Sequence, residues 1–200
     1  MPSGAQVTPV TRWHSILANR MFRGVAFVWG CAGFALRHHL LGPQASAAGL
    51  QRLYGRAAAW SLRYGGAQVG ARTVIEGPLF VNVDVGLGFS TLAIGEECYL
   101  GESVHLDIKG VVEIGDRNTI SMGCYLLSHQ DVGRSRLAAR MPEVRPGVRL
   151  GSDCYIGAGA ILLPGVTLGD ACVVGAGAVV TGDVPPNHRA VGVPAKAHPR

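Results

Sequence analysis

The sequence predicts a mainly β chain that folds as a parallel β-helix in the form of a triangular prism, preceded by an N-terminal helical segment. Three observations carry this prediction. Val144, Leu150, Ile156 and Leu162 belong to a run of branched aliphatic anchors at every sixth position, and a glycine directly follows several of them. A small or β-branched residue stands four positions after each anchor of this run. A period of six fits neither a half-buried strand nor an amphipathic helix, and indicates a chain that turns a corner every six residues.

The same frame extends through most of the chain, with one extra residue before Ile94 and two before Ile114. The seventeen anchors predict between five and six coils of three flat faces each. A β-sandwich would need turn pairs such as Asn-Gly or Asp-Gly, and the sequence contains none. The remaining anchors are Val69, Ile75, Val81, Leu87, Leu100, Leu106, Ile120, Leu126, Leu168, Val174 and Val180.

The chain therefore divides into three parts. Residues 1–68 form a basic, apolar and mostly helical segment, residues 69–184 the β-helix, and residues 185–200 a C-terminal tail. Four of the five cysteines occupy the small position after an anchor, and no CxxC pair occurs, which indicates small core side chains in a reducing compartment. These four are Cys98, Cys124, Cys154 and Cys172.

The N-terminal segment differs from the rest in charge. Residues 1–75 hold eight arginines and no Asp or Glu, whereas the other residues hold ten basic and thirteen acidic side chains. The uninterrupted apolar run 24–36 is too short to span a bilayer, which takes ~20 residues. Two interpretations stay open, and both can hold at once. In the first, the helices cap the open end of the prism. In the second, residues 12–63 lie on an anionic membrane surface.

The repeat has one large interruption, the loop 128–143, and it begins with Ser128, His129 and Asp131. A long loop on a regular scaffold usually carries function. Of the seven histidines, only His129 lies where the wall of the prism opens.

At this point the residues resemble a known family. The stretches LAIGEECYLGESVHLDIKGVVEIGD, ISMGCYLLSHQD and LGSDCYIGAGAILLPGVTLGDACVVGAGAVVTGDVPPN, with the exit VGVPAK, are similar to the hexapeptide-repeat acyltransferases of left-handed β-helix fold. Within them the chain most resembles the sugar O-acetyltransferases of the colanic-acid and exopolysaccharide type. The resemblance implies a homotrimer with active sites in the grooves between prisms, acetyl-CoA as co-substrate, and a sugar or glycan acceptor. It also implies polysaccharide biosynthesis. We expect a cytoplasmic protein, and the basic, apolar N-terminal segment favours a place at the inner face of the membrane.

The resemblance further implies roles for individual residues. His129 would act as general base, since a neutral imidazole accepts protons near neutral pH. A backbone amide at Gly157 or Ala158 would hold the oxyanion. No metal is expected. Cofactor-binding candidates are Gly157, Ala158, Gly175, Ala176 and Thr181, with Arg189 and Lys196 near the nucleotide phosphates. Acceptor-binding candidates are His105, Tyr155, Asp131 and Asp107, the last of which either binds acceptor hydroxyls or caps a corner.

Other functions fit less well. The basic residues are not interleaved with stacking aromatics, which argues against nucleic acid. His105 and His129 are the only wall histidines, too few for the zinc site of a carbonic anhydrase. The main alternative is a non-catalytic trimeric scaffold that binds anionic glycans. Its candidate residues are the loop arginines Arg134, Arg136, Arg140 and Arg145. The sequence names neither the acceptor nor the acyl chain length.

Overall fold

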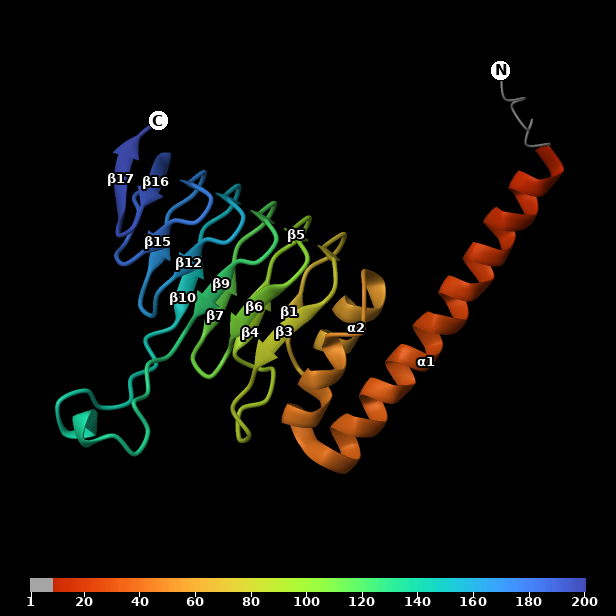
Figure 1. Cartoon of the computed structure of the whole chain (residues 1–200), viewed down its shortest axis with the longest axis horizontal. Coiled ribbons are helices and arrows are strands. Elements are labelled where there is room, and N and C mark those ends of the chain that lie inside the picture. The colour runs from red at the N-terminus through yellow and green to blue at the C-terminus, as the bar shows by residue number, and fades with distance from the viewer. Residues whose placement is uncertain (1–8) are drawn as a thin grey trace, which may run out of the picture.

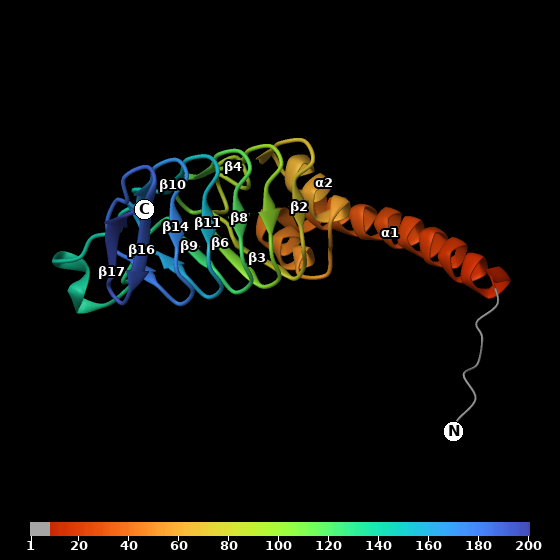
Figure 2. The same ribbon diagram turned by 90° about the horizontal axis from the view of Figure 1, so that it is seen from above.

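The computed structural model describes residues 9–200, with side chains from residue 24 onward, and it confirms the predicted parallel β-helix (Figures 1 and 2). Fifteen short strands wind into three parallel sheets of five strands each, and two further strands extend one of these sheets at the C-terminal end. This gives five complete coils and part of a sixth, as the number of anchors predicts.

The three sheets are the faces of the prism, here called A, B and C. Sheet A contains β1 (Gln68–Val69), β4 (Leu92–Ile94), β7 (Val112–Ile114), β10 (Val148–Leu150) and β13 (Thr167–Leu168). Sheet B contains β2 (Val74–Ile75), β5 (Tyr99–Leu100), β8 (Thr119–Ile120), β11 (Tyr155–Ile156), β14 (Val173–Val174), β16 (His188–Gly192) and β17 (Ala195–Pro199). Sheet C contains β3 (Leu79–Asn82), β6 (Val104–Asp107), β9 (Tyr125–Leu127), β12 (Ile161–Leu162) and β15 (Val179–Val180).

The corner between sheets A and B carries a column of small side chains that tie successive coils together. The thiol of Cys154 donates to the carbonyl of Gly169 at 3.2 Å, and the amide of Asn118 donates to the carbonyl of Gly151 at 2.8 Å. Burial raises the pKa of Cys154 to about 11, so this thiol keeps its proton at neutral pH. The prediction that the cysteines are small core residues is confirmed, since all four are buried: Cys98, Cys124, Cys154 and Cys172.

Two predicted anchors do not enter the core. Leu87 is 48% exposed, in an excursion of the chain between β3 and β4. Val144 is 43% exposed, and the wall resumes only at Val148. Both residues keep the six-residue frame where the chain has left the wall, so no core exists there for their side chains. The large interruption therefore covers residues 128–147 instead of 128–143, and it contains a short 3₁₀ helix, η1 (Arg136–Ala139).

Two helices precede the first coil, α1 (Pro9–Leu50) and α2 (Arg56–Tyr64). Helix α2 buries Ala58 and Leu62 against the end of the prism. The guanidinium of Arg63 donates to the carbonyls of Val69 and Gly70, both at 2.8 Å. Helix α2 thus covers strand edges that would otherwise be unpaired, as the capping interpretation predicts.

Helix α1 bends at Gly42, which has a φ of 82°, and its N-terminal part projects well beyond the prism (Figures 1 and 2). Phe34 fixes helix α1 to the body of the protein. The ring of Phe34 is buried, and its centroid lies 5.9 Å from the ring centroid of Phe89. Within residues 9–200, no helix has a stretch long and apolar enough to cross a membrane.

The close stacking of the coils leads to a stability prediction. A Cβ at Gly115 would lie 2.7 Å from the backbone carbon of Gly151, whereas a Cβ at Gly182 would meet no atom within 4 Å. We expect Gly115→Ala to destabilise the fold by about 1–3 kcal/mol, the usual effect of overpacking. Gly182→Ala is the matched control and is expected to change nothing. Thermal and denaturant unfolding of both variants checks this, and equal midpoints would contradict it.

Candidate active site

The most specific polar arrangement on the prism joins His129 to Asp107. Nδ1 of the imidazole is hydrogen-bonded to Oδ2 of the carboxylate, and the two side chains are 16% and 7% exposed. Because an ionised carboxylate only accepts hydrogen bonds, Nδ1 carries the proton, and in the neutral imidazole Nε2 then has the free lone pair. None of the hydrogen bonds within residues 24–200 uses this Nε2 atom.

Asp107 is fixed by the residues that open the loop. Its Oδ2 atom accepts from the amide of Ser128 at 3.0 Å, the hydroxyl of Ser128 at 3.2 Å and the amide of His129 at 3.1 Å. Its Oδ1 atom accepts from the side-chain amide of Asn82 at 3.0 Å. Of the two roles predicted for Asp107, these contacts support the one within the protein, in which its carboxylate orients His129. The binding of acceptor hydroxyls by Asp107 stays a prediction.

The sequence did not point to the support that Ser128 and Asn82 give to this pair. A signal for it does exist in the register of sheet C. Asn82, Asp107 and Leu127 are consecutive partners across β3, β6 and β9, so the residues that follow β9 must pass close to Asp107. Aligning the coils, in addition to counting anchors, would have found this support.

The loop closes on itself directly after His129. Gln130 and Val144 exchange backbone hydrogen bonds of 2.9 and 3.0 Å, and the amide of Gly147 donates to the carbonyl of Ser128 at 3.1 Å. The ends of the loop are thus held together, and His129 sits at its rigid base rather than at its exposed tip.

Arg145 ties the base of the loop to the excursion between β3 and β4. Its guanidinium lies 2.9 Å from Oδ2 of Asp84 and 2.6 Å from Oε1 of Glu143. Hydrogen bonds from the amide of Gly86 and from Arg145 lower the pKa of Asp84. The other loop arginines are exposed and form no ion pair within residues 24–200: Arg134, Arg136 and Arg140.

The predicted site residues divide between two corners of the prism. His129 and Thr181 follow sheet C, whereas Ala158 lies at the corner that precedes sheet C. The amide of Gly159 donates to the carbonyl of Met122 at 2.9 Å, so Ala158 is level with Met122, seven residues before His129. At ~3.3 Å per extended residue, Ala158 and His129 of one chain are roughly 20 Å apart. The other cofactor candidates at the corner of Ala158 are Gly157, Gly175 and Ala176.

The two candidate oxyanion donors differ in availability. The amide of Gly157 donates to the carbonyl of Val174 at 2.8 Å, whereas the amide of Ala158 is absent from the hydrogen bonds of the described residues. The same is true of the amides of Met122 and Ala176 at the same corner, so a row of free amides runs along this edge. Gly157 has a packing role of its own, because a Cβ there would lie 2.5 Å from the amide nitrogen of Ala176.

The remaining candidates lie on other surfaces of the chain. Arg189 and Lys196 are exposed on β16 and β17, at the C-terminal end of sheet B. Tyr155 is exposed on sheet B and does not share a face with His129 in one chain. Asp131 accepts the amide of Gly133 at 2.6 Å in a turn of the loop. His105 lies on the outer side of sheet C, two residues before Asp107.

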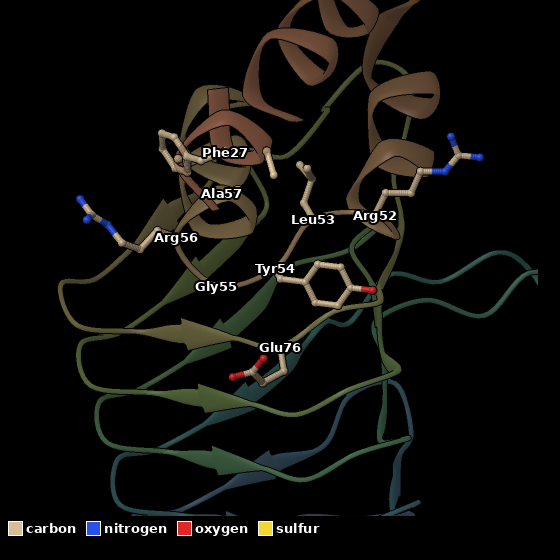
Figure 3. Close-up of a pocket in the computed structure, with 10 residues that line it drawn as sticks. Phe27, Arg52, Leu53, Tyr54, Gly55, Arg56, Ala57 and Glu76 are labelled. Atoms are coloured by element: carbon tan, nitrogen blue, oxygen red, sulfur yellow. The ribbon is translucent and has the colours of Figure 1, made fainter. Parts of the chain in front are cut away.

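A cavity of about 790 Å³ lies where the N-terminal helices meet the first coil, away from His129 (Figure 3). It is open to solvent and is lined by the segment 52–57, by Phe27 of α1 and by Glu76 after β2, and no residue of the His129 coil lines it. Among the described side chains, no group of three His, Cys, Asp or Glu residues is arranged to hold a metal ion.

Comparison with known proteins places these features in a family. The profile "Bacterial transferase hexapeptide (six repeats)" matches residues 147–182, and "Hexapeptide repeat of succinyl-transferase" matches residues 91–128. Nodulation protein L of Rhizobium meliloti (strain 1021) is 43% identical over 138 residues, which cover 68% of this chain and 71% of that protein.

Solved structures share the fold. A galactoside acetyltransferase in complex with coenzyme A is 26% identical with a TM-score of 0.66, over 84% of this chain and 81% of its own. A hexapeptide-repeat-containing acetyltransferase of Vibrio cholerae is 20% identical with a TM-score of 0.66, over 84% and 90% of the two chains. The extent of the match to Nodulation protein L, the two repeat profiles and the observed prism lead to one conclusion: the chain is an acyltransferase of the hexapeptide-repeat family.

Proposed function

We propose that this enzyme is an acetyl-CoA-dependent O-acetyltransferase that acts on a hydroxyl of a sugar or glycan, with His129 as its general base. The observation that carries the proposal is the hydrogen bond from Nδ1 of His129 to the buried Asp107. It leaves Nε2 as a proton acceptor at the rigid base of the loop. Membership of an acyltransferase family weighs against the non-catalytic scaffold.

The proposed reaction follows from this tautomer. Nε2 of His129 takes the proton of the acceptor hydroxyl while the oxygen attacks the thioester carbonyl. A free backbone amide, that of Ala158, donates a hydrogen bond to the oxyanion that forms. When the carbon–sulfur bond breaks, the thiolate of coenzyme A takes the proton from Nε2. The products are an acetyl ester and free coenzyme A, and His129 returns to its starting state.

The position of Ala158 supports a trimer. His129 and the free amide of Ala158 lie at opposite corners of sheet C, so one chain alone does not bring them to a common substrate. Two prisms packed side by side would place one corner of each in the same groove. We therefore propose a homotrimer in which neighbouring chains complete each site.

The choice of donor and acceptor has support from a relative. The galactoside acetyltransferase that shares this fold was solved with coenzyme A. The exposed Arg189 and Lys196, beside the corner that carries Gly175 and Ala176, are suited to the phosphates of such a donor. No acidic side chain is present in residues 184–200 to oppose them.

A second proposal concerns where the enzyme works. Helix α1 exposes a row of apolar side chains at helical spacing, with Trp29 at 74%, Leu36 at 61% and Leu40 at 70% exposure. The first 75 residues carry only positive formal charge. We propose that this face of α1 lies on the anionic, cytoplasmic surface of a membrane and brings the enzyme close to membrane-associated glycans.

Removal of the base tests the main proposal. His129→Ala is expected to lower kcat by ~10²–10⁴-fold with acetyl-CoA and a sugar panel, and Asp107→Asn by about 10²-fold because the tautomer is no longer fixed. Thiol release and acetyl ester formation are measured together. Gln130→Ala, the exposed neighbour, is the matched control and should keep full activity. Unchanged turnover in His129→Ala would remove this residue from the mechanism.

The intersubunit site is tested by mixing two inactive variants. His129→Ala lacks the base, and Ala158→Pro lacks the amide proton. If neighbouring chains share a site, random mixed trimers regain intact grooves and roughly a quarter of the wild-type activity. If each chain holds a complete site, the mixture stays inactive. Native mass spectrometry of the two variants, carrying tags of different mass, confirms that mixed trimers have formed.

Co-sedimentation with vesicles tests the role of α1. The enzyme is expected to bind phosphatidylglycerol-containing vesicles and to lose this binding in the double variant Trp29→Glu, Leu36→Glu. The double variant Gln44→Glu, Ala48→Glu adds the same charge at exposed positions near the bend and should still bind. Equal binding to pure phosphatidylcholine, or full binding by the first variant, would contradict the proposal.

A further inference from the structure

The backbone on both sides of His129 is held by the segment that returns from the loop. The carbonyl of Ser128 accepts a hydrogen bond from the amide of Gly147 at 3.1 Å. Gln130 exchanges backbone hydrogen bonds of 2.9 and 3.0 Å with Val144. The residues before and after His129 are therefore tied to the returning segment, and whatever fixes that segment also fixes where the imidazole lies.

Arg145 belongs to the returning segment and joins it to parts of the chain outside the loop. Its Nη1 atom donates to Oδ2 of Asp84 at 2.9 Å and to the carbonyl of Lys109 at 3.2 Å. Its Nε atom donates to Oε1 of Glu143 at 2.6 Å, within the loop itself. The contacts of Arg145 with Asp84 and Lys109 thus anchor the base of the loop to the two coils that precede it.

Asp84 is a rigid anchor because its own turn is closed by hydrogen bonds. Its Oδ1 atom accepts from the amide of Gly86 at 2.8 Å and from the amide of Leu87 at 3.3 Å. Its carbonyl accepts from the amide of Gly88 at 2.9 Å. One carboxylate oxygen is used within the turn, and the other is left for the guanidinium of Arg145.

The first coil therefore supports the hydrogen bond between His129 and Asp107 by two routes. Asn82, the last residue of β3, donates to Asp107 and fixes the acceptor of that bond. Asp84, two residues further along the chain, holds Arg145 and through it the backbone around the donor. Because this hydrogen bond decides which ring nitrogen of His129 is free, its alignment needs both routes.

We propose that Asp84 and Arg145 are positioning residues, whose ion pair holds the backbone around His129 so that the imidazole stays aligned with Asp107. This inference rests on the proposed function, in which His129 takes the proton of the acceptor. Neither Asp84 nor Arg145 touches a reacting atom in that scheme. Their contacts lie within one chain, so they are present whichever surfaces the neighbouring chains of a trimer cover.

A second ion pair of similar length provides matched controls. Arg117 lies 2.7 Å from Asp153, and both are partly exposed, as are Arg145 and Asp84. The Arg117–Asp153 pair lies at the corner between sheets A and B, which borders neither side of sheet C and carries none of the predicted site residues. Partly exposed ion pairs contribute little to global stability, so Asp84→Asn and Asp153→Asn are both expected to unfold close to the wild-type midpoint.

Kinetics separate positioning from substrate binding. Asp84→Asn keeps the Oδ1 acceptor for its turn and removes the charge that faces Arg145. Asp84→Asn and Arg145→Gln are each expected to lower kcat by roughly 10-fold, with the KM values for acetyl-CoA and for the acceptor unchanged. The double variant is expected to lose no more than either single variant, because the two residues act through one contact.

Two further variants sharpen the kinetic test. Arg145→Lys keeps the positive charge and is expected to retain more kcat than Arg145→Gln. Asp153→Asn is expected to keep full kcat. Unchanged kcat in Asp84→Asn and Arg145→Gln, or a loss confined to KM, would overturn the proposal.

The proton on Nδ1 of His129 gives a readout that needs no turnover. A proton held between an imidazole and a buried carboxylate is protected from exchange with solvent and gives its own ¹H NMR signal, which is identified by its absence from His129→Ala. We expect this signal in the wild type and in Asp153→Asn, and its loss by exchange broadening in Asp84→Asn. Its absence from the wild type, or its persistence unchanged in Asp84→Asn, contradicts the positioning role.

The two readouts keep this inference separate from the proposed function. If the wild type acetylates no sugar while the Nδ1 signal is lost in Asp84→Asn, the ion pair positions His129 and only the O-acetyltransferase assignment fails. If kcat falls in Asp84→Asn while the signal persists, the ion pair acts elsewhere and the positioning role is wrong.

Discussion

The vertical pairing of the coils is the constraint on which the rest of the structure depends. Each strand is only two to four residues long in the wall, so its stability comes from hydrogen bonds to the coils above and below. Backbones approach so closely at the corners that a methyl group at Gly115 has no space. This rigid register is what brings Asp107 of one coil under the backbone amides of Ser128 and His129 of the next.

Much of this fold follows from the sequence because one interaction pattern repeats. An inward aliphatic and a small corner residue satisfy the same geometric need in each coil, so Leu150, Cys154 and Ile156 are buried as their spacing predicts. The spacing misleads where the chain keeps the six-residue frame outside the wall. Leu87 and Val144 have the expected residue type and spacing, but the frame does not reveal whether the chain is still in the wall.

The site was partly predictable for a similar reason. The break in the repeat and the family resemblance singled out His129, and the structure gives that residue a buried carboxylate partner. The role of Asp107 was harder to predict, because it depends on a contact between coils rather than on a local motif. Its carboxylate accepts five hydrogen bonds within the protein, and no spacing rule describes them. The division of the remaining candidates between two corners likewise appears only when the coils are wound in three dimensions.

The two ends of the prism have a consequence for how copies of the protein associate. Stacked strands with open edges invite end-to-end growth into filaments. At one end helix α2 occupies the first coil, with Arg63 bonded to its carbonyls. At the other end β17 runs antiparallel to β16, contains Lys196 and His198, and finishes at Pro199, so it is a poor template for another strand. With strand pairing hindered at both ends, the flanks of the prism are the surfaces left for the association that the proposed trimer requires, and side-by-side contacts favour closed rings over fibres.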